Sequence, residues 1–143
     1  HSHLMVKIYI DNNEVVSPTG NAGFWSIVLD RQPNGAIATF ADIYLTMDIP
    51  ALGQRNPVSF QERFKVLATE DWVCASQSGG VPYYMTRYVD LKRLTAGDQT
   101  TSFGGTGGAI TDINEGAIYI VYATMAQGTN NMNASVLYKF TDM

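Results

Sequence analysis

Short apolar runs rich in β-branched and aromatic residues alternate along this chain with clusters of Gly, Pro, Asn and Ser. The runs have the length of β-strands, and turn-rich separators at this spacing are typical of an all-β sandwich or barrel. The pattern predicts six strands, at residues 6–10, 24–30, 63–69, 83–94, 117–125 and 135–142. A short segment at 72–75 is expected either to extend the third strand or to form a separate one.

Two of these strands differ in the arrangement of their apolar residues. Residues 117–125 are almost continuously apolar, as expected for a strand that is covered on both faces. Residues 135–142 alternate instead, with Val136, Tyr138 and Phe140 on one side of the strand. This alternation predicts that the last strand has a single buried face.

The segment at 39–46 has the spacing of a short helix. Phe40, Ile43 and Tyr44 fall at positions i, i+3 and i+4, and Pro50 prevents a long continuation. Just before this segment, the sequence Gln-Pro-Asn-Gly at 32–35 has Pro at its second and Gly at its fourth position, which predicts a type I turn. The chain is therefore expected to leave its second strand abruptly and to form one or two helical turns.

The length of 143 residues suits one domain with its own core, and a chain of this size needs no metal or disulfide to fold. We assign residues 6–143 to this domain and interpret residues 1–5, which contain both histidines, as the remnant of an expression tag. The single cysteine, Cys74, excludes an intramolecular disulfide and a cysteine-based zinc site. No apolar run reaches the ~20 residues that a membrane-spanning helix needs.

Few residues of the chain could carry out catalysis. Without a histidine in residues 6–143, a serine nucleophile lacks its usual base. Asp112 and Glu115 bracket a polar turn and could pair as the acid and base of a glycosidase, but no second motif supports them. The glycine-rich segment at 101–108 lacks the Gly-Lys-Ser/Thr ending of a phosphate-binding loop. The sequence therefore predicts a protein that is not an enzyme and has no cofactor or metal site.

The charge balance is acidic, with a formal net charge of −4 at pH 7. Because the affinity of a nucleic-acid binder comes largely from neutralised phosphates, this charge argues against a stand-alone nucleic-acid-binding domain. Local contacts stay open, since basic residues an even number of positions apart share one face of a strand. The candidate nucleic-acid contacts are Lys7, Arg63, Lys65, Arg87, Lys92 and Arg93.

The aromatic residues leave a second kind of binding open. The chain has 8 Tyr and 2 Trp, which could form a platform for sugar rings or nucleic-acid bases, or could fill the core and the contacts between subunits. A carbohydrate-binding jelly-roll module would expose Trp25 or Trp72 in a groove. A structural protein would bury both rings.

Several segments, in order along the chain, carry a family resemblance. They read Phe-Trp-Ser-Ile-Val-Leu-Asp-Arg-Gln-Pro-Asn-Gly-Ala at 24–36, Ala-Asp-Ile at 41–43, Gln-Glu-Arg-Phe-Lys-Val-Leu at 61–67, Gly-Ala-Ile-Tyr at 116–119 and Val-Leu-Tyr-Lys-Phe-Thr-Asp at 136–142. Together they resemble the capsid proteins of small circular single-stranded DNA viruses that encode a Rep protein, a broad group that includes circoviruses, nanoviruses and geminiviruses. The most specific piece is Asp-Arg-Gln-Pro-Asn-Gly at 30–35.

The resemblance implies a viral jelly-roll β-sandwich of eight strands that assembles with identical copies into a small icosahedral shell around single-stranded DNA. It also implies a place in the virion, with assembly in the host nucleus. Members usually begin with an Arg/Lys-rich arm that binds the genome, and here Lys7 is the only basic side chain in the first predicted strand. We therefore expect that this arm is absent from the sequence. Because the predicted strands fall short of eight, we expect that an N-terminal strand is missing as well.

Overall fold

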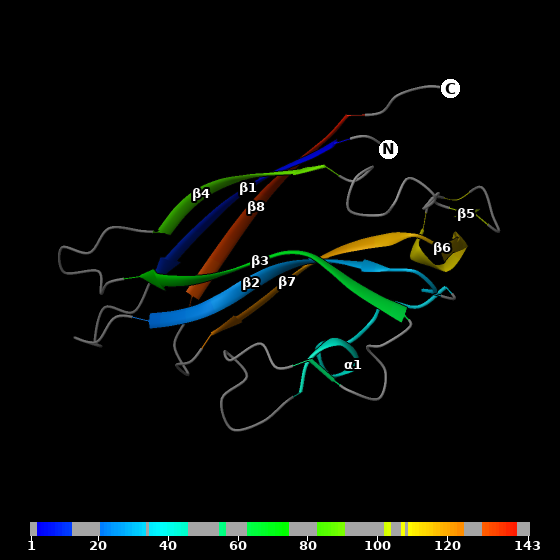
Figure 1. The fold of residues 1–143 in the computed structure, drawn as a ribbon, viewed down its shortest axis with the longest axis horizontal. Coiled ribbons are helices and arrows are strands. Elements are labelled where there is room, and N and C mark those ends of the chain that lie inside the picture. The colour runs from blue at the N-terminus through cyan, green and yellow to red at the C-terminus, as the bar shows by residue number, and fades with distance from the viewer. Residues whose placement is uncertain are drawn as a thin grey trace.

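The chain forms two stacked antiparallel sheets with a short helix on one outer side (Figure 1). The computed structural model describes residues 3–12, 21–33, 35–45, 55–56, 63–74, 83–90, 102–103, 107, 109–124 and 130–139. The strands are β1 (His3–Asn12), β2 (Asn21–Asp30), β3 (Phe64–Cys74), β4 (Tyr83–Asp90), β5 (Ser102–Phe103), β6 (Ile113–Glu115), β7 (Ala117–Thr124) and β8 (Asn130–Lys139). The helices are α1 (Phe40–Ile43) and the 3-10 helix η2 (Ile110–Asp112).

The two main sheets have the strand orders β4-β1-β8 and β3-β2-β7, and a small third sheet pairs β5 with β6. All pairings between these strands are antiparallel. The chain passes from one main sheet to the other between β1 and β2, between β3 and β4, between β4 and β7 by way of β5 and β6, and between β7 and β8. The two main sheets thus form two layers joined by connections that cross between them, and this arrangement confirms the predicted all-β sandwich.

The core between the sheets is built on the alternation of β1. Leu4, Val6, Ile8 and Ile10 are each at most 1% exposed, and the residues between them face outward. The other buried members of this cluster are Trp25, Ile27, Leu29, Leu67, Ala68, Trp72, Cys74 and Val89. Because burying one large apolar side chain stabilises a fold by roughly 1.5–3 kcal/mol, this cluster supplies much of the driving force for stacking the sheets.

A second cluster lies on the outer side of the β3-β2-β7 sheet, where α1 covers it (Figure 1). The helix predicted at 39–46 forms only over Phe40–Ile43. The ring of Tyr44, directly after α1, meets the ring of Phe24 edge-on, with 4.9 Å between the centroids. The buried members of this cluster are Phe24, Val28, Ile43, Tyr44, Phe64 and Ala123. As a result, β2 is buried on both of its faces from Phe24 to Asp30.

All six strands predicted from the apolar pattern are present, with shifted ends. The first begins at His3 rather than at residue 6, because Leu4 is buried and pairs with Val89. Residues 3–5 therefore belong to the sheet, contrary to their exclusion from the fold. The interpretation of residues 1–5 as a tag remnant stays a prediction. The third strand continues to Cys74, so residues 72–74 extend it, and residue 75 lies outside the described residues.

The end of the chain differs more from its pattern. β8 begins at Asn130 rather than at residue 135, and 140–142 lie outside the described residues. Val136 pairs with the buried Val6 but is itself 40% exposed, since β8 lies at an edge of its sheet, so the predicted buried face is only partly formed. The short strands β5 and β6 were not predicted. They form a separate two-stranded sheet, so the two layers of the sandwich hold six of the described strands, and the expectation of a missing N-terminal strand stays a prediction.

The turn after β2 lies one residue later than predicted. The backbone N–H of Ala36 donates to the carbonyl of Pro33 at 3.0 Å, so the turn spans 33–36 and Gly35 is its third residue. Gly35 has a φ of 74°, which glycine adopts without steric cost and which a type I turn does not contain at this position. Its N–H also donates to the carbonyl of Ile113 at 3.2 Å, which ties the turn to β6.

Gly23 allows β2 to approach its neighbours closely. A Cβ at this position would overlap the backbone carbonyl of Ala123 and would lie 2.8 Å from the ring of Trp72. That ring is held in place by stacking on Tyr122, with 5.6 Å between the centroids. Neither neighbour can move without disturbing the sheet or the core, so the position requires glycine.

We expect Gly23→Ala to lower the free energy of unfolding by about 1–3 kcal/mol or more, because the added methyl group overpacks the core. The matched control is Gly107→Ala, whose Cβ would meet only the carboxylate end of Asp112 at 2.8 Å and should change stability by less than about 0.5 kcal/mol. Urea unfolding followed by circular dichroism measures both values. Equal stabilities of the two variants would contradict the packing argument.

Candidate functional site

The predicted basic contacts do not gather on one surface. Lys7 is exposed on the outward side of β1, whereas Arg87 pairs with the buried Val6 and so starts from the inward side of the same sheet. Strand register thus places these two side chains on opposite faces. Lys92 and Arg93 lie outside the described residues, and their roles stay predictions.

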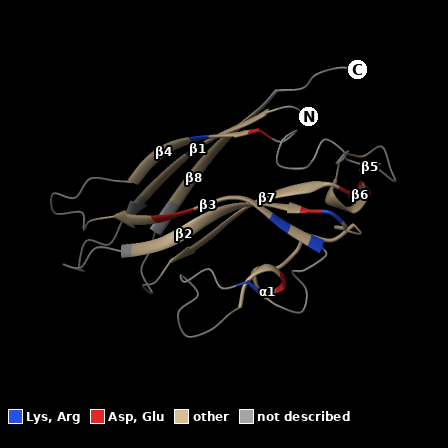
Figure 2. Ribbon diagram, in the orientation of Figure 1, with Lys and Arg blue, Asp and Glu red and all other residues tan. Residues whose placement is uncertain are grey.

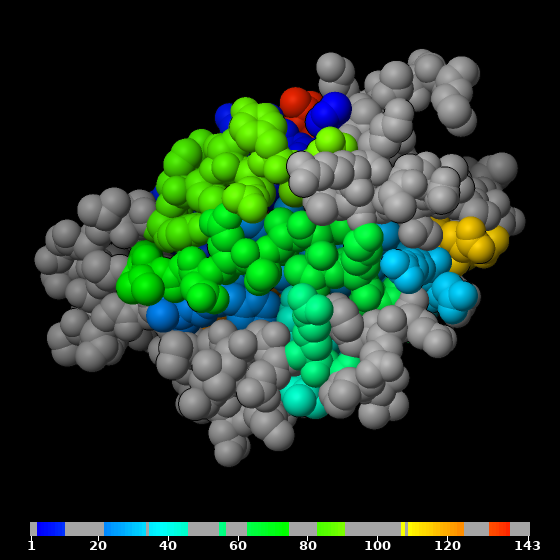
Figure 3. All heavy atoms as spheres, viewed as in Figure 1, coloured from blue at the N-terminus to red at the C-terminus, as the bar shows by residue number. Residues whose placement is uncertain are grey.

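Arg87 joins the edges of the two layers. Its Nη1 donates to Oε1 of Glu70 on β3 at 2.9 Å, with side chains that are 48% and 28% exposed. Figure 3 shows the side chains of β3 and β4 meeting along this edge of the sandwich. A pair this exposed contributes about 0.2–1 kcal/mol. The charge of Arg87 is thereby balanced within the chain.

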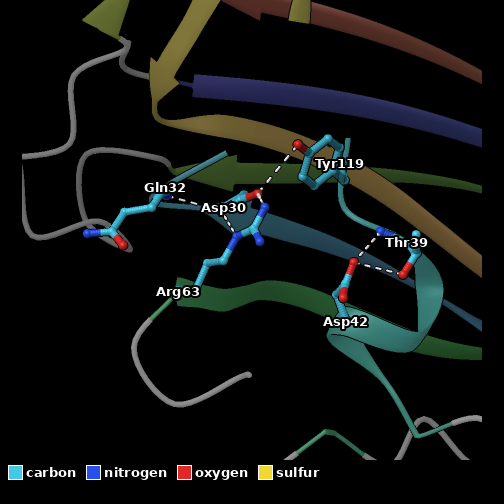
Figure 4. A network of polar contacts seen from close by, with 6 residues as sticks. All are labelled: Asp30, Gln32, Thr39, Asp42, Arg63 and Tyr119. Carbon is cyan, nitrogen blue, oxygen red and sulfur yellow. Dashed lines mark hydrogen bonds and ion pairs between the residues drawn. The ribbon is translucent and has the colours of Figure 1, made fainter. Parts of the chain in front are cut away.

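Arg63 reaches back from the start of β3 to Asp30, whose side chain is 0% exposed at the end of β2 (Figure 4). Nε of Arg63 donates to Oδ1 at 2.9 Å, and Nη2 donates to Oδ2 at 2.8 Å. The backbone N–H of Gln32 donates to Oδ1 at 3.0 Å, and the hydroxyl of Tyr119 donates to Oδ2 at 3.5 Å. The buried carboxylate therefore has hydrogen-bond donors on both oxygens, as a buried polar group requires.

The pair with Asp30 also defines the environment of Arg63. The hydrogen bonds that Arg63 donates to Asp30 raise the pKa of the Arg63 guanidinium. The same group lies 4.8 Å from the centre of the Phe64 ring, within the range of a cation–π contact. Because the fork of the guanidinium is occupied by Asp30, the described geometry gives Arg63 a structural role. Its prediction as a nucleic-acid contact is not tested by this geometry.

The two-residue spacing of Arg63 and Lys65 predicted that they share one face of the strand. In the structure they lie on opposite faces. Lys65 pairs with Leu29, whose side chain belongs to the core between the sheets, while Arg63 lies before the strand and turns toward the opposite side. Figure 2 shows that charged residues gather where β2 ends and β3 begins, beside α1. This cluster contains both signs, so it does not form a basic patch.

Asp42 holds the start of α1 next to this network (Figure 4). The backbone N–H and the hydroxyl of Thr39 both donate to Oδ2 of Asp42 at 2.7 Å. These bonds favour the ionised carboxylate and lower the pKa of Asp42. The arrangement caps the helix and uses the acidic side chain for folding.

Two tyrosine hydroxyls complete the polar contacts on this side of the sheet. The hydroxyl of Tyr44 donates to Oγ of Ser26 at 2.6 Å, in a fully buried position. Burial raises the pKa of Tyr44, and burial together with the negative charge of Asp30 raises the pKa of Tyr119. Both hydroxyls thus stay protonated and act as donors at neutral pH.

The two tryptophans are core residues. Trp25 is 0% exposed and Trp72 is 1% exposed. Nε1 of Trp25 donates to the hydroxyl of Tyr83 at 3.2 Å, which links β2 to β4 across the core. A carbohydrate platform built on Trp25 or Trp72 is therefore wrong, since neither ring can meet a sugar.

The carboxylates considered for catalysis lie on the β5-β6 side of the fold. Asp112 accepts a hydrogen bond from the N–H of Ala109 at 3.3 Å and caps η2, while Glu115 is exposed on β6. The geometry gives Asp112 a structural task and shows no contact between the two carboxylates. Among the described residues, no group of three or more His, Cys, Asp or Glu side chains could hold a metal ion. A search of the same residues finds no helix long and apolar enough to cross a membrane.

Sequence reasoning missed the contact between Asp30 and Arg63. The two residues are far apart in the sequence, and each looks like an ordinary solvated end of a strand. A signal was present, because Asp30 directly follows seven positions, 23–29, that are buried and mostly apolar. An acid in that setting must find a partner, although the sequence pattern does not say which one.

The two-layer fold, its internally paired charges and its buried tryptophans define a β-sandwich protein whose polar network serves its own packing. Comparison with family models then gives a match to the Geminivirus coat protein/nuclear export factor BR1 family over residues 2–142, and the chain belongs to that family. This confirms the resemblance to coat proteins of single-stranded DNA viruses. A structural role as a viral coat protein, found in the virion, follows from the family. A search of curated proteins gives no match.

We expect Arg63→Met to lower the free energy of unfolding by roughly 2–4 kcal/mol, because it leaves the carboxylate of Asp30 buried without a counter-ion. The control is Arg87→Met, which removes an exposed ion pair and should cost less than about 1 kcal/mol. Arg63→Lys should fall between the two, since lysine keeps the charge but not the fork. Chemical denaturation measures all three, and a loss at Arg63 no larger than at Arg87 would refute this account.

We expect the protein to lose stability in alkaline solution. The ordinary tyrosine pKa is 10.0, and Tyr44 and Tyr119 have raised values when folded. Above pH 10 the folded protein keeps protons that the unfolded chain has lost, so the free energy of unfolding falls as pH rises through the folded-state pKa values and is unaffected well below pH 10. Tyr44→Phe should cost about 1 kcal/mol at neutral pH through the lost bond to Ser26, yet flatten this alkaline decline. Urea unfolding over a pH series measures the slope, which an unchanged profile would contradict.

Proposed function

We propose that this coat protein assembles with identical copies into a small, T=1 icosahedral shell that encloses single-stranded DNA. The observation that carries the proposal is the family match over residues 2–142 on a two-layer β-sandwich. A sandwich of this kind can present its loops, sheet edges and outer faces to several neighbours at once. Its interior is filled by apolar side chains of both sheets, which leaves its outer surfaces to form contacts.

The distribution of exposed apolar residues supports several contacts per subunit. Large apolar side chains are exposed at separate places on the described surface, next to α1, on β3 and on β8. They include Ile37 (66%), Val73 (73%) and Val136 (40%). Permanent interfaces are generally large, about 2,000–5,000 Å² in total, and more apolar than the rest of the surface. A charge content of only 15% agrees with a surface that is largely covered in the assembly.

The charge of the chain suggests that the genome is bound mainly by another segment and only weakly by this domain. The net charge is −4, and both Arg63 and Arg87 form ion pairs within the chain. We therefore propose that most phosphates are neutralised by a basic segment outside this sequence. Lys7, Lys65, Lys92 and Arg93 would add weaker local contacts. Assembly in the host nucleus, where such a genome is copied, belongs to the same proposal.

Assembly can be tested by electron microscopy and sedimentation of this chain in two extended forms. One carries an N-terminal Arg/Lys-rich segment, and the other carries a Gly/Ser segment of the same length as the control. With added single-stranded DNA, we expect uniform closed particles from the basic form and little DNA in any particles of the control, because phosphate neutralisation is electrostatic. A protein that stays monomeric in both forms would overturn the proposal.

A further inference from the structure

The outer face of the β4-β1-β8 sheet carries an ordered set of side chains that no described element covers. On β1, the residues between the buried ones point to this face, and the register fixes their neighbours on β4 and β8. Three successive rows across the sheet result. They contain Tyr84, Tyr9 and Asn133 in the first row, Thr86, Lys7 and Ser135 in the second, and Tyr88, Met5 and Leu137 in the third.

The outermost strand of this face presents two exposed aromatic rings. Tyr84 is 62% exposed and Tyr88 is 74% exposed. They are four residues apart on β4, which corresponds to about 13 Å along the strand. Tyr9 stands directly opposite Tyr84 on the neighbouring strand and widens the aromatic surface there. The spacing is wide enough for each ring of β4 to take a base of its own.

The three rows carry a positive charge at their centre. Lys7 lies in the middle row, between the two aromatic rows and about 7 Å from each along the strand. None of the carboxylates of the chain falls in these three rows, and the exposed Asp90 lies in the next row, opposite His3. The hydroxyls of Thr86 and Ser135 flank Lys7 and offer further hydrogen-bond donors to phosphate oxygens.

We propose that the outer face of the β4-β1-β8 sheet binds single-stranded DNA, with Tyr84 and Tyr88 stacking bases and Lys7 contacting the phosphate between them. Stacking on aromatic rings beside a cation is the general mode by which proteins hold single strands without reading their sequence. A duplex cannot bind in this way, because the faces of its bases are already stacked on the neighbouring base pairs. The inference rests on the proposed function and deepens it by naming the surface that meets the genome.

The composition of the face favours a nucleic acid over a second protein subunit. Protein interfaces are enriched in tyrosine and methionine, which this face also carries, but they are depleted in lysine, and here Lys7 occupies the central row. The opposite layer offers a contrast, since α1 already covers the outer side of the β3-β2-β7 sheet with an apolar cluster. The exposed rings of the β4-β1-β8 sheet have no such cover in the described part of the chain.

The test is a filter-binding titration of the purified protein with oligo(dT) of about ten nucleotides, a length that spans one such surface. An abasic oligonucleotide of equal length and a DNA duplex serve as comparison probes. We expect Tyr84→Ser and Tyr88→Ser each to weaken oligo(dT) binding by about 5- to 150-fold, and the corresponding Phe variants to retain it. Lys7→Gln should reduce the slope of log affinity against log salt by about one.

The matched control is Val73→Ser, which alters a side chain of equal exposure, 73%, on the outer face of the other sheet. This variant should bind oligo(dT) like the parent protein, and thermal unfolding should show that all variants remain folded. Equal binding of oligo(dT) and the abasic strand would overturn the proposal, because no base would be stacking. So would Ser variants that bind DNA normally but fail to associate with other subunits, since the face would then be a protein interface.

The DNA-binding proposal and the assembly proposal can be refuted independently of each other. If particles form and the Ser variants bind oligo(dT) as tightly as the parent, the assembly proposal stands and the platform is wrong. If no particles form in any condition while the rings are still required for oligo(dT) binding, the platform stands and the shell proposal is wrong. The absorbance ratio of purified particles at 260 and 280 nm reports their DNA content.

Discussion

Burial of β2 on both faces is the constraint on which this structure depends. From Phe24 to Asp30 the strand is enclosed between the core of the sandwich and the cluster under α1. An enclosed strand can keep a polar side chain only if the fold supplies a partner for it. Ser26 and Asp30 are the two buried polar residues of the described chain, and they receive Tyr44 and Arg63 respectively. The residue that follows α1 and the residue that precedes β3 are thus positioned by contacts with one buried strand.

The two outer faces of the sandwich have different consequences for the molecule. The face of the β3-β2-β7 sheet is covered by α1 around Phe24 and Val28, while Val73 on the same face stays exposed. The face of the β4-β1-β8 sheet keeps tyrosines and a lysine on its surface, where they are available to something else. The two outer faces of the subunit therefore differ, since α1 packs on one sheet and no described element packs on the other. A closed shell, which has an inner and an outer surface, requires a subunit with two different sides.

Much of the fold was readable from the sequence, because strands follow from local alternation and turn residues. The six main strands, the short helix at Phe40 and the coat-protein resemblance were all predicted correctly. The polar contacts were not readable, since the pairing of Asp30 with Arg63 depends on which strands become neighbours. The separation of Lys7 from Arg87 depends in the same way on register, because a shift of one residue exchanges the faces of a strand. The turn at Gly35 was misplaced by one residue because the contact with Ile113 that fixes it comes from a distant segment.

The location of the tryptophans gives the molecule a convenient optical property. Trp25 and Trp72 are the only tryptophans of the chain, and both lie in the interior. Their intrinsic emission therefore responds to loss of the core and is insensitive to events on the tyrosine-bearing outer face. Tryptophan fluorescence can consequently report whether the subunit remains folded while a ligand binds to that face in the same sample.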